Sequence, residues 1–552
     1  MSTASETYTG GSVGVGILDK ERIIARPGFN RWLVPPAALA IHLCIGMAYG
    51  FSVFWLPLSR AIGIDQPVVC ADLNVFTALF TTTCDWRVSD LGWMYTLFFV
   101  FLGSAAAIWG GWLERAGPRK AGLASMVCWC GGMIIAAIGI ITHQLWLMWL
   151  GAGVIGGIGL GLGYISPVST LIKWFPDRRG MATGMAIMGF GGGAMIGAPL
   201  ANFLMNTFRT EDSVGVWQTF VVMALLYAVA MTLGAFGYRI PPSGWRPEGW
   251  TPPANTNKAM ITTRHVHLRD AHKTTQFWLI WAVLMLNVSA GIGVIGMASP
   301  MLQEIFAGDL IGLPDLSFNE LDASQKTAIA GIAAGFAGLL SLFNIVGRFF
   351  WASLSDYIGR KNTYYTFLLL GIVLYALAPT AAHMGSQLLF VLMFGIILSM
   401  YGGGFATIPA YLADIFGTQF VGAIHGRLLT AWSTAGIVGP VVVNYIREFQ
   451  LAAGIPRAQV YDFTMYILAG MLALGVVANF FVRPLADKWF KSDAEVASLQ
   501  AKTAASQTEQ TGSFGIGKGG LDAKAAIAWT AVGVPILWGI WVTLEKTAAL
   551  FG

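Results

Sequence analysis

The segment SLFNIVGRFFWASLSDYIGR, residues 341–360, places an arginine inside an otherwise apolar stretch. Arg348 precedes Asp356 by two helical turns, which at ~1.5 Å per residue is about 12 Å along a helix. A charged side chain at such depth in an apolar layer costs about 3 to 15 kcal/mol, so it usually contacts a partner or a ligand. Asn344, one turn earlier, can orient the guanidinium or share its ligand. The planar fork of Arg348 suits bidentate capture of a carboxylate.

The elements that must hold these residues are membrane helices. The chain of 552 residues is 56% hydrophobic and 11% charged, which leaves too little polar surface to enclose a soluble core. Because a spanning helix needs roughly 20 apolar residues, twelve such helices are expected in two sets of six, followed by a thirteenth. The predicted fold is an all-α membrane protein with an N-terminal segment at 1–31, a six-helix bundle at 32–238, a linker at 239–275, a second bundle at 276–482, a polar tail at 483–523 and the thirteenth helix at 524–544.

The two halves of the chain repeat at a constant offset of 242 residues, which pairs Glu114 with Asp356 and Gly117 with Gly359. One offset across several helices indicates duplication of a six-helix unit. Two such repeats joined by a polar linker resemble the architecture of the major facilitator superfamily.

A loop motif is part of this repeat, as GGWLERAGPRK at 110–120 and SDYIGRK at 355–361. Each copy has an acid, a glycine turn and then bases. The acid can cap or pair near a helix terminus while the bases stay in the cytosol, so the motif can latch neighbouring helices in one state. An ordinary basic loop is the alternative. The predicted gating motif comprises Glu114, Arg115, Gly117, Arg119, Asp356, Gly359, Arg360 and Lys361.

Residues without a counterpart in the other half are better candidates for chemistry. Arg348 corresponds to Ala106, so the duplicated scaffold does not require a charge at this place. Extension of Arg348 to the membrane surface, or pairing with a backbone carbonyl, remains the structural alternative. Aromatic residues in helices 1, 2, 4 and 10 extend the candidate site, with packing or interfacial anchoring as their alternative roles: Tyr49, Tyr95, Tyr164, Tyr401 and Phe405.

Titratable side chains at depth are few. No Asp or Glu is expected in the middle of a span, because the acids near the apolar segments fall at their ends: Asp90, Asp414, Asp462, Asp522 and Glu545. Proton-coupled carriers commonly keep such a carboxylate as a relay, whereas exchange of one anion for another needs none. His42 lies within the first span, either as a hydrogen-bonding residue in helix packing or as a proton site.

The distribution of Lys and Arg predicts the orientation. Segments on the side of the N-terminus carry 25 of the 33 bases, the opposite side carries 7, and Arg348 is the remainder. Since cytoplasmic loops are enriched in these residues, the N-terminus is expected in the cytoplasm and the end of the thirteenth helix in the periplasm. Cys70 and Cys84 fall in the long loop between the first two spans, on the oxidising side, where they can form a disulfide.

The stretch YISPVSTLIKWFPDRRGMATGMAIMGFGGGAMIGAP at 164–199, together with FNIVGRFFWASLSDYIGRK and PAYLADIFG, resembles the oxalate:formate antiporter family. This resemblance covers about 30–485. It implies exchange of small carboxylates across a bacterial inner membrane, with Arg348 in the place of the substrate-binding arginine. Such carriers pair that arginine with a lysine, where this chain has Trp432. One cation balances one negative charge, so a monocarboxylate such as formate, lactate or pyruvate is an alternative to oxalate.

The predicted function is secondary active transport of small organic anions by alternating access, as an oxalate/formate-type antiporter. A proton-linked monocarboxylate symporter using His42 is one alternative, and a membrane sensor or assembly subunit on a carrier fold is another. Paired carboxylates, a metal cluster or a nucleophile triad are not found in the sequence, so an enzyme is not expected. The expected partners are a small carboxylate and the lipid bilayer, with no cofactor, metal or nucleic acid and a monomeric state.

Overall fold

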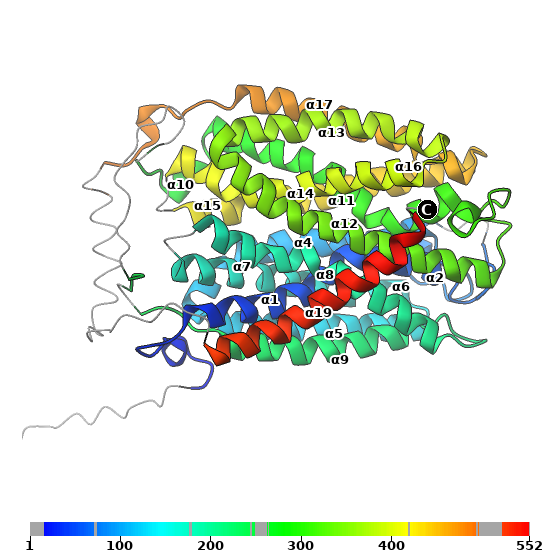
Figure 1. The fold of residues 1–552 in the computed structure, drawn as a ribbon, viewed down its shortest axis with the longest axis horizontal. Coiled ribbons are helices and arrows are strands. Elements are labelled where there is room, and N and C mark those ends of the chain that lie inside the picture. Colours follow the sequence, from blue (N-terminus) through cyan, green and yellow to red (C-terminus); the bar gives the residue numbers. More distant parts are fainter. Residues whose placement is uncertain are drawn as a thin grey trace, which may run out of the picture.

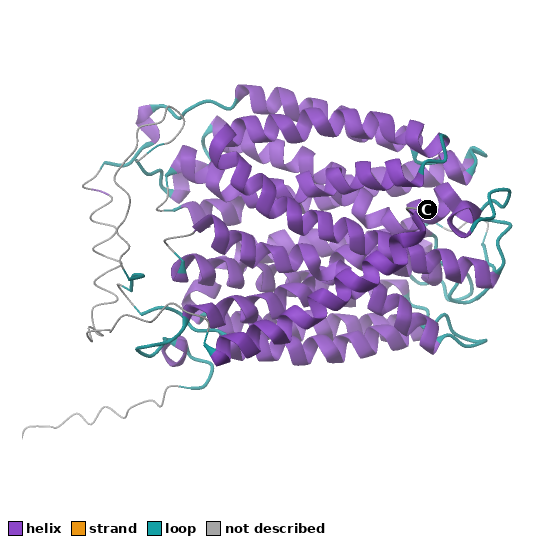
Figure 2. Cartoon of the chain, in the orientation of Figure 1, coloured by secondary structure: helices purple, strands orange, loops and turns teal. Residues whose placement is uncertain are grey.

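The computed structural model describes residues 16–70, 74–175, 179–242, 245–248, 262, 264–417, 420–492, 495 and 522–550. Within these residues the named elements are all helices, and thirteen helices are long and apolar enough to cross a membrane. The predicted all-α fold with two six-helix bundles and one further helix is confirmed (Figures 1 and 2).

The first bundle begins with a helix that changes character along its length, from α1 (Val34–Ile45) through the 3₁₀ segment η3 (Gly46–Phe54) to α2 (Trp55–Leu58). The other spanning helices of this bundle are α4 (Val88–Ala116), α5 (Pro118–Ile141), α6 (Leu145–Met148) continued by a π-helical stretch (Trp149–Gly156) and α7 (Gly157–Trp174), α8 (Arg179–Phe208) and α9 (Val216–Gly237). Glycines let the first helix approach α8 closely. A Cβ atom on Gly193 would lie 2.2 Å from the carbonyl carbon of Gly46, so the two backbones are in contact.

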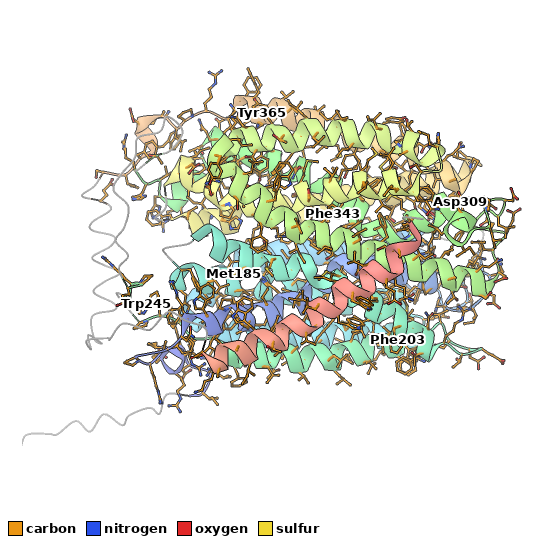
Figure 3. The ribbon with its side chains drawn as sticks, viewed as in Figure 1. Met185, Phe203, Trp245, Asp309, Phe343 and Tyr365 are labelled. Carbon is orange, nitrogen blue, oxygen red and sulfur yellow. A yellow bond between two sulfur atoms is a disulfide. The ribbon has the colours of Figure 1, made fainter. Side chains whose placement is uncertain are left out.

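The second bundle contains α11 (Thr275–Phe306), α12 (Ala323–Ile358), α13 (Arg360–His383), α14 (Gln387–Phe416), α15 (Val421–Leu428) with α16 (Thr430–Ala452), and α17 (Asp462–Phe481). A capping box starts α12, in which Asp322 accepts from the backbone N–H of Gln325 at 2.8 Å and the Gln325 side chain accepts from Asp322. The end of α9 and the start of α11 lie at one end of the molecule, which we call the linker end and where Figure 3 labels Trp245; Asp309 marks the opposite end.

The loop motif adopts the same turn in both halves. Gly117 has φ +86° between α4 and α5, and Gly359 has φ +84° between α12 and α13. Such left-handed backbone favours glycine because it has no Cβ atom. In the second half Arg360 pairs with Asp356 and lies 3.6 Å from Asp414 of α14, which links three helices. The side chains of Glu114 and Arg115 lie outside the described residues, so the latch stays a prediction.

The bases of the motif also have equivalent contacts. Arg119 donates to the carbonyl of Phe236 at 3.2 Å, near the end of α9. Lys361, its counterpart at the offset of 242, donates to the carbonyl of Phe480 at 3.0 Å, near the end of α17. Cations at these places complement the partial negative charge of a helix C-terminus. Arg119 therefore links α5 to α9 in the first bundle, and Lys361 links α13 to α17 in the second.

The thirteenth helix, α19 (Ala523–Thr547), runs diagonally across the molecule from the linker end to the opposite end (Figure 1). It packs against α12 of the second bundle and α8 of the first. Gly338 makes room for it, since a Cβ atom there would lie 2.4 Å from Thr543 Oγ1. Thr543 also donates to the carbonyl of Met195 at 3.3 Å. This added helix therefore contacts both halves.

Cys70 and Cys84 form a disulfide in the segment between α2 and α4, with their Cα atoms 5.9 Å apart. The three other cysteines are Cys44, Cys128 and Cys130. We expect denatured, unreduced protein to take up three alkyl groups and reduced protein five, as measured by intact mass. A Cys70→Ser variant should take up four groups in both conditions. Five groups on unreduced parent protein would contradict the bond.

Candidate functional site

Arg348 lies inside the molecule on α12, with only 1% of its surface exposed. Its Nε donates to Oδ1 of Asn344 at 3.0 Å, the orientation expected from their spacing. The carbon atom of the guanidinium lies 5.7 Å from the centre of the Phe405 ring. Its Nη1 atom is buried and has no hydrogen-bond partner among the described residues. The side chain therefore stays inside instead of extending to the membrane surface.

Two glycines from other helices make room for this pair. A Cβ atom on Gly191 of α8 would lie 2.9 Å from Nε of Arg348. A Cβ atom on Gly402 of α14 would lie 2.4 Å from Oδ1 of Asn344. A Cβ atom on Gly402 would also lie 2.3 Å from the backbone oxygen of Asn344, so that position needs a residue without one, whereas at Gly191 the Arg348 side chain would have to shift. Arg348 belongs to the second bundle but lies against α8 of the first, at the interface between the halves.

Trp432 of α16 is the centre of an aromatic cluster at this interface and is fully buried. Its ring centre lies 4.5 Å from Phe405, 5.1 Å from Tyr164, and 5.5 Å from both Phe99 and Phe190. The first bundle supplies three of these four rings. Because Phe405 also lies beside the guanidinium, Trp432 and Arg348 share a neighbour. The structure thus brings together two residues that are distant in sequence and that we singled out separately.

The candidate tyrosines lie around the same cluster. The hydroxyl groups of Tyr49 in η3 and Tyr401 in α14 are hydrogen-bonded at 2.8 Å, which joins the two halves directly. Tyr49, Tyr164 and Tyr401 lie within electrostatic reach of the Arg348 guanidinium. Tyr95 lies toward the opposite end, where its ring approaches Gly296 of α11. All four tyrosines are at most 1% exposed, so none is an interfacial anchor in this state.

Several buried atoms that can donate hydrogen bonds have no partner among the described residues. They are Arg348 Nη1, Asn344 Nδ2, Trp432 Nε1 and the hydroxyl groups of Tyr95 and Tyr164. A buried polar group without a partner costs about 1 to 3 kcal/mol, and more when it is charged. Of these, the donors of Asn344 and Tyr164 lie near the Arg348 guanidinium, and together they are complementary to a small anion with several acceptor atoms.

His42 joins helices within the first bundle. Its two ring nitrogens face the carbonyl oxygens of Ala186 in α8 and Tyr164 in α7, the latter at 3.2 Å. The imidazole also stacks on the Tyr164 ring, with centres 5.5 Å apart. These contacts favour the packing role that we considered for this residue, although the guanidinium of Arg348 is within electrostatic reach.

Glu304 is a buried acid that our reading of the sequence overlooked. We did not count Glu304 among the acids near the apolar segments, but α11 continues to Phe306 and holds the Glu304 side chain at 0% exposure. Arg447 donates to it through Nε at 2.8 Å, Arg457 also pairs with it, and the Tyr461 hydroxyl donates at 2.7 Å. Two guanidinium groups compensate this carboxylate near the end opposite the linker. The sequence indication of this longer helix was the stretch MASPMLQEIF at 297–306, in which Gln303 and Glu304 are followed by two further apolar residues.

The Major Facilitator Superfamily family model matches residues 38–440 and 316–545, so the chain belongs to this superfamily of membrane transporters. Its similarity to the oxalate:formate antiporter of Oxalobacter formigenes is 24% identity over 414 residues, which are 74% of this chain and 83% of that protein. The apicoplast pyruvate carrier 1 of Toxoplasma gondii is 24% identical over 449 residues, covering 70% of this chain and 78% of the carrier. The predicted resemblance to oxalate:formate antiporters is confirmed.

A solved structure supports the fold. A bacterial homologue of the human lysosomal transporter Spinster, in an inward-facing and unoccupied conformation, aligns with a TM-score of 0.51 at 14% sequence identity. The alignment covers 94% of this chain and 97% of that one.

Proposed function

We propose that this protein is a secondary active antiporter of small carboxylates, with Arg348 as the principal electrostatic contact for the substrate. One observation carries the proposal: a buried guanidinium with an unpartnered nitrogen lies at the interface of the two halves, among further donors without partners. A carboxylate supplies one negative charge and two oxygens, which matches this arrangement. The similarity to an oxalate:formate antiporter supports the same substrate class.

The identity of residue 432 favours monocarboxylates as a second candidate substrate class. Trp432 is an uncharged side chain beside the site and contacts the same ring, Phe405, as the guanidinium. A dianion such as oxalate would then be balanced by Arg348 alone. The similarity to a pyruvate carrier also supports this class.

The position of Arg348 explains why exchange would be favoured over net transport. Its charge lies between the two bundles, beside Gly191 of one and Phe405 of the other. An unneutralised guanidinium opposes closure of an apolar interface around it, because a buried charge without a partner is costly. A bound carboxylate removes that cost. Reorientation is therefore easiest when an anion is bound in either direction.

Counterflow in proteoliposomes tests this proposal. Vesicles preloaded with unlabelled formate, oxalate, lactate or pyruvate should accumulate labelled substrate, whereas empty vesicles should not. A pH gradient that drives uptake into empty vesicles, with loss of uptake in a His42→Gln variant, would instead support the proton-linked symporter. Absence of counterflow with every carboxylate would reject the antiporter and favour the sensor or assembly role.

The orientation proposed from the distribution of bases places the linker end in the cytoplasm of a bacterium and the opposite end in the periplasm. The direction of α19 agrees with thirteen crossings, because it ends away from the linker end (Figure 1). A reporter fused after Gly552 should therefore be active only as a periplasmic reporter. A fusion within the linker, after Pro242, should give the opposite result. Cytoplasmic activity of the C-terminal fusion would reject this orientation or the thirteenth crossing.

A further inference from the structure

The end opposite the linker contains a cavity of about 320 Å³ between the two bundles. We refer to it as the vestibule. Five of the seven bases that the sequence assigns to this side of the membrane line it: Arg60, Arg87, Lys326, Arg447 and Arg457. The three acids that line it are Asp65, Asp85 and Glu448. These bases come from both halves of the chain and from segments that are distant in sequence.

The acids of the vestibule already have partners. Asp85 accepts from the backbone N–H groups of Ile62, Gly63 and Val68 at 2.7 to 2.9 Å. Asp65 lies 3.3 Å from Arg209, and Glu448 lies 3.0 Å from Arg447. Three of the bases that line the vestibule form ion pairs with acids that do not line it.

Arg87 forms two hydrogen bonds with Asp90, each 2.9 Å long. Arg447 and Arg457 share Glu304. Two bases then remain, Arg60 and Lys326, for which the described residues include no ion-pair partner.

Lys326 is unusual for a surface lysine because its residue is 92% buried, with 8% of its surface exposed into the vestibule. No acceptor among the described residues lies within hydrogen-bond distance of its ammonium group. It lies in the first turn of α12, where the helix dipole disfavours a cation. Two bases, Arg60 and Arg457, and two acids, Asp65 and Asp322, lie within electrostatic reach of it.

The neighbours of Lys326 increase the excess of positive charge. Lys326 and Arg457 share the Phe318 ring, whose centre lies 5.8 Å from Lys326 Nζ and 5.4 Å from the guanidinium carbon of Arg457. Nε of Arg60 is buried and has no partner among the described residues. Burial, and next the charge of Arg209, hold the pKa of Arg60 below its usual value. An anion in the vestibule would satisfy both Lys326 and Arg60.

A barrier separates this place from Arg348. Gln303 lines the vestibule and donates to Ser299, whose backbone N–H donates to Ser52 of the first bundle at 3.4 Å. One turn further along α11, Trp55 donates to the carbonyl of Gly296 at 2.8 Å. Gly291, which packs on Tyr401, follows. At ~1.5 Å per residue, Gln303 and Gly291 are about 18 Å apart.

From these contacts we propose a second anion-binding site in the vestibule, at Lys326 and Arg60, that binds the small carboxylate substrate before the barrier opens. This site rests on the proposed function for the nature of its ligand. Lys326 comes from the second bundle and Arg60 from the first, so a bound anion would bridge the halves. Positive potential at a narrow entrance also raises the local concentration of anions.

Equilibrium dialysis of the purified full chain against labelled oxalate at low ionic strength tests the proposal. The parent should bind two anions, Arg348→Gln should keep the vestibule anion, Lys326→Gln should keep the central anion, and the double variant should bind none. Lys326→Gln should weaken the vestibule site at least about tenfold, because a charge-assisted hydrogen bond is lost. Lys273→Gln, an exposed lysine at the linker end, is the matched control.

The outcomes distinguish this proposal from the proposed function. An unchanged number of bound anions in Lys326→Gln would overturn the vestibule site, whatever Arg348→Gln does. Loss of one anion in Lys326→Gln but none in Arg348→Gln would retain the vestibule site and reject the central one. Arg60→Gln, in the other bundle, should repeat the effect if Lys326→Gln does not fold. In the parent, about 0.1 M salt should weaken the vestibule site more than the buried central site, and equal weakening would contradict the proposal.

Discussion

Replacing Arg348 with Gln should weaken carboxylate binding at least about tenfold, because a charge-assisted hydrogen bond contributes roughly 1.5 to 3 kcal/mol. Replacement with Lys should weaken binding less, since it keeps the charge but loses the planar fork and the geometry of the 3.0 Å bond to Asn344. Substrate binding to the purified protein measures both effects. Arg264→Gln, which removes an exposed guanidinium paired with Asp487, is the control and should bind as the parent does.

Although Arg348→Gln should weaken binding, it should not lower the stability of the ligand-free protein. Arg348 is 1% exposed and has no acid partner among the described residues, so its charge is uncompensated without substrate. Removing it should leave the melting temperature of the ligand-free protein unchanged or raise it. If Arg348→Gln binds and exchanges carboxylates as the parent does, the arginine is scaffold and the proposed substrate class loses its physical support.

Replacing Trp432 with Lys should shift substrate preference toward dianions by at least about tenfold, measured as the ratio of oxalate to formate binding. The new ammonium would lie among the rings that surround Trp432, beside Phe405, whose ring centre also lies 5.7 Å from the guanidinium carbon. Absolute affinity and stability should both fall, since loss of a buried tryptophan costs about 3 to 5 kcal/mol. The ratio isolates the effect of charge.

A Trp432→Phe variant controls for the lost packing. It keeps an aromatic ring against Phe405 and Tyr164 but adds no charge, so it should weaken both substrates without changing their ratio. An unchanged ratio in Trp432→Lys would show that residue 432 does not face the substrate. The monocarboxylate alternative would then lose the observation that favours it.

The amino-acid sequence by itself determined the number of helices, their duplication and the position of Arg348 within an apolar helix. These are local properties: a bilayer requires about 20 apolar residues for each crossing, and one arginine interrupts such a segment wherever the helix packs. The turns at Gly117 and Gly359, which have positive φ angles, could also be predicted, because each depends on a motif that is continuous in sequence. Spacing alone also predicted that Asn344 orients Arg348.

Only the tertiary structure decided which side chains meet. Trp432 and Arg348 share Phe405, and Lys326 and Arg60 line one vestibule, although the members of each pair are distant in sequence. Hydropathy gives each helix a position along the membrane normal but not its rotation or neighbours, which depend on close packing over the whole bundle. Unpartnered donors and uncompensated charges are therefore visible only after the helices are assembled, since a group lacks a partner only with respect to its neighbours.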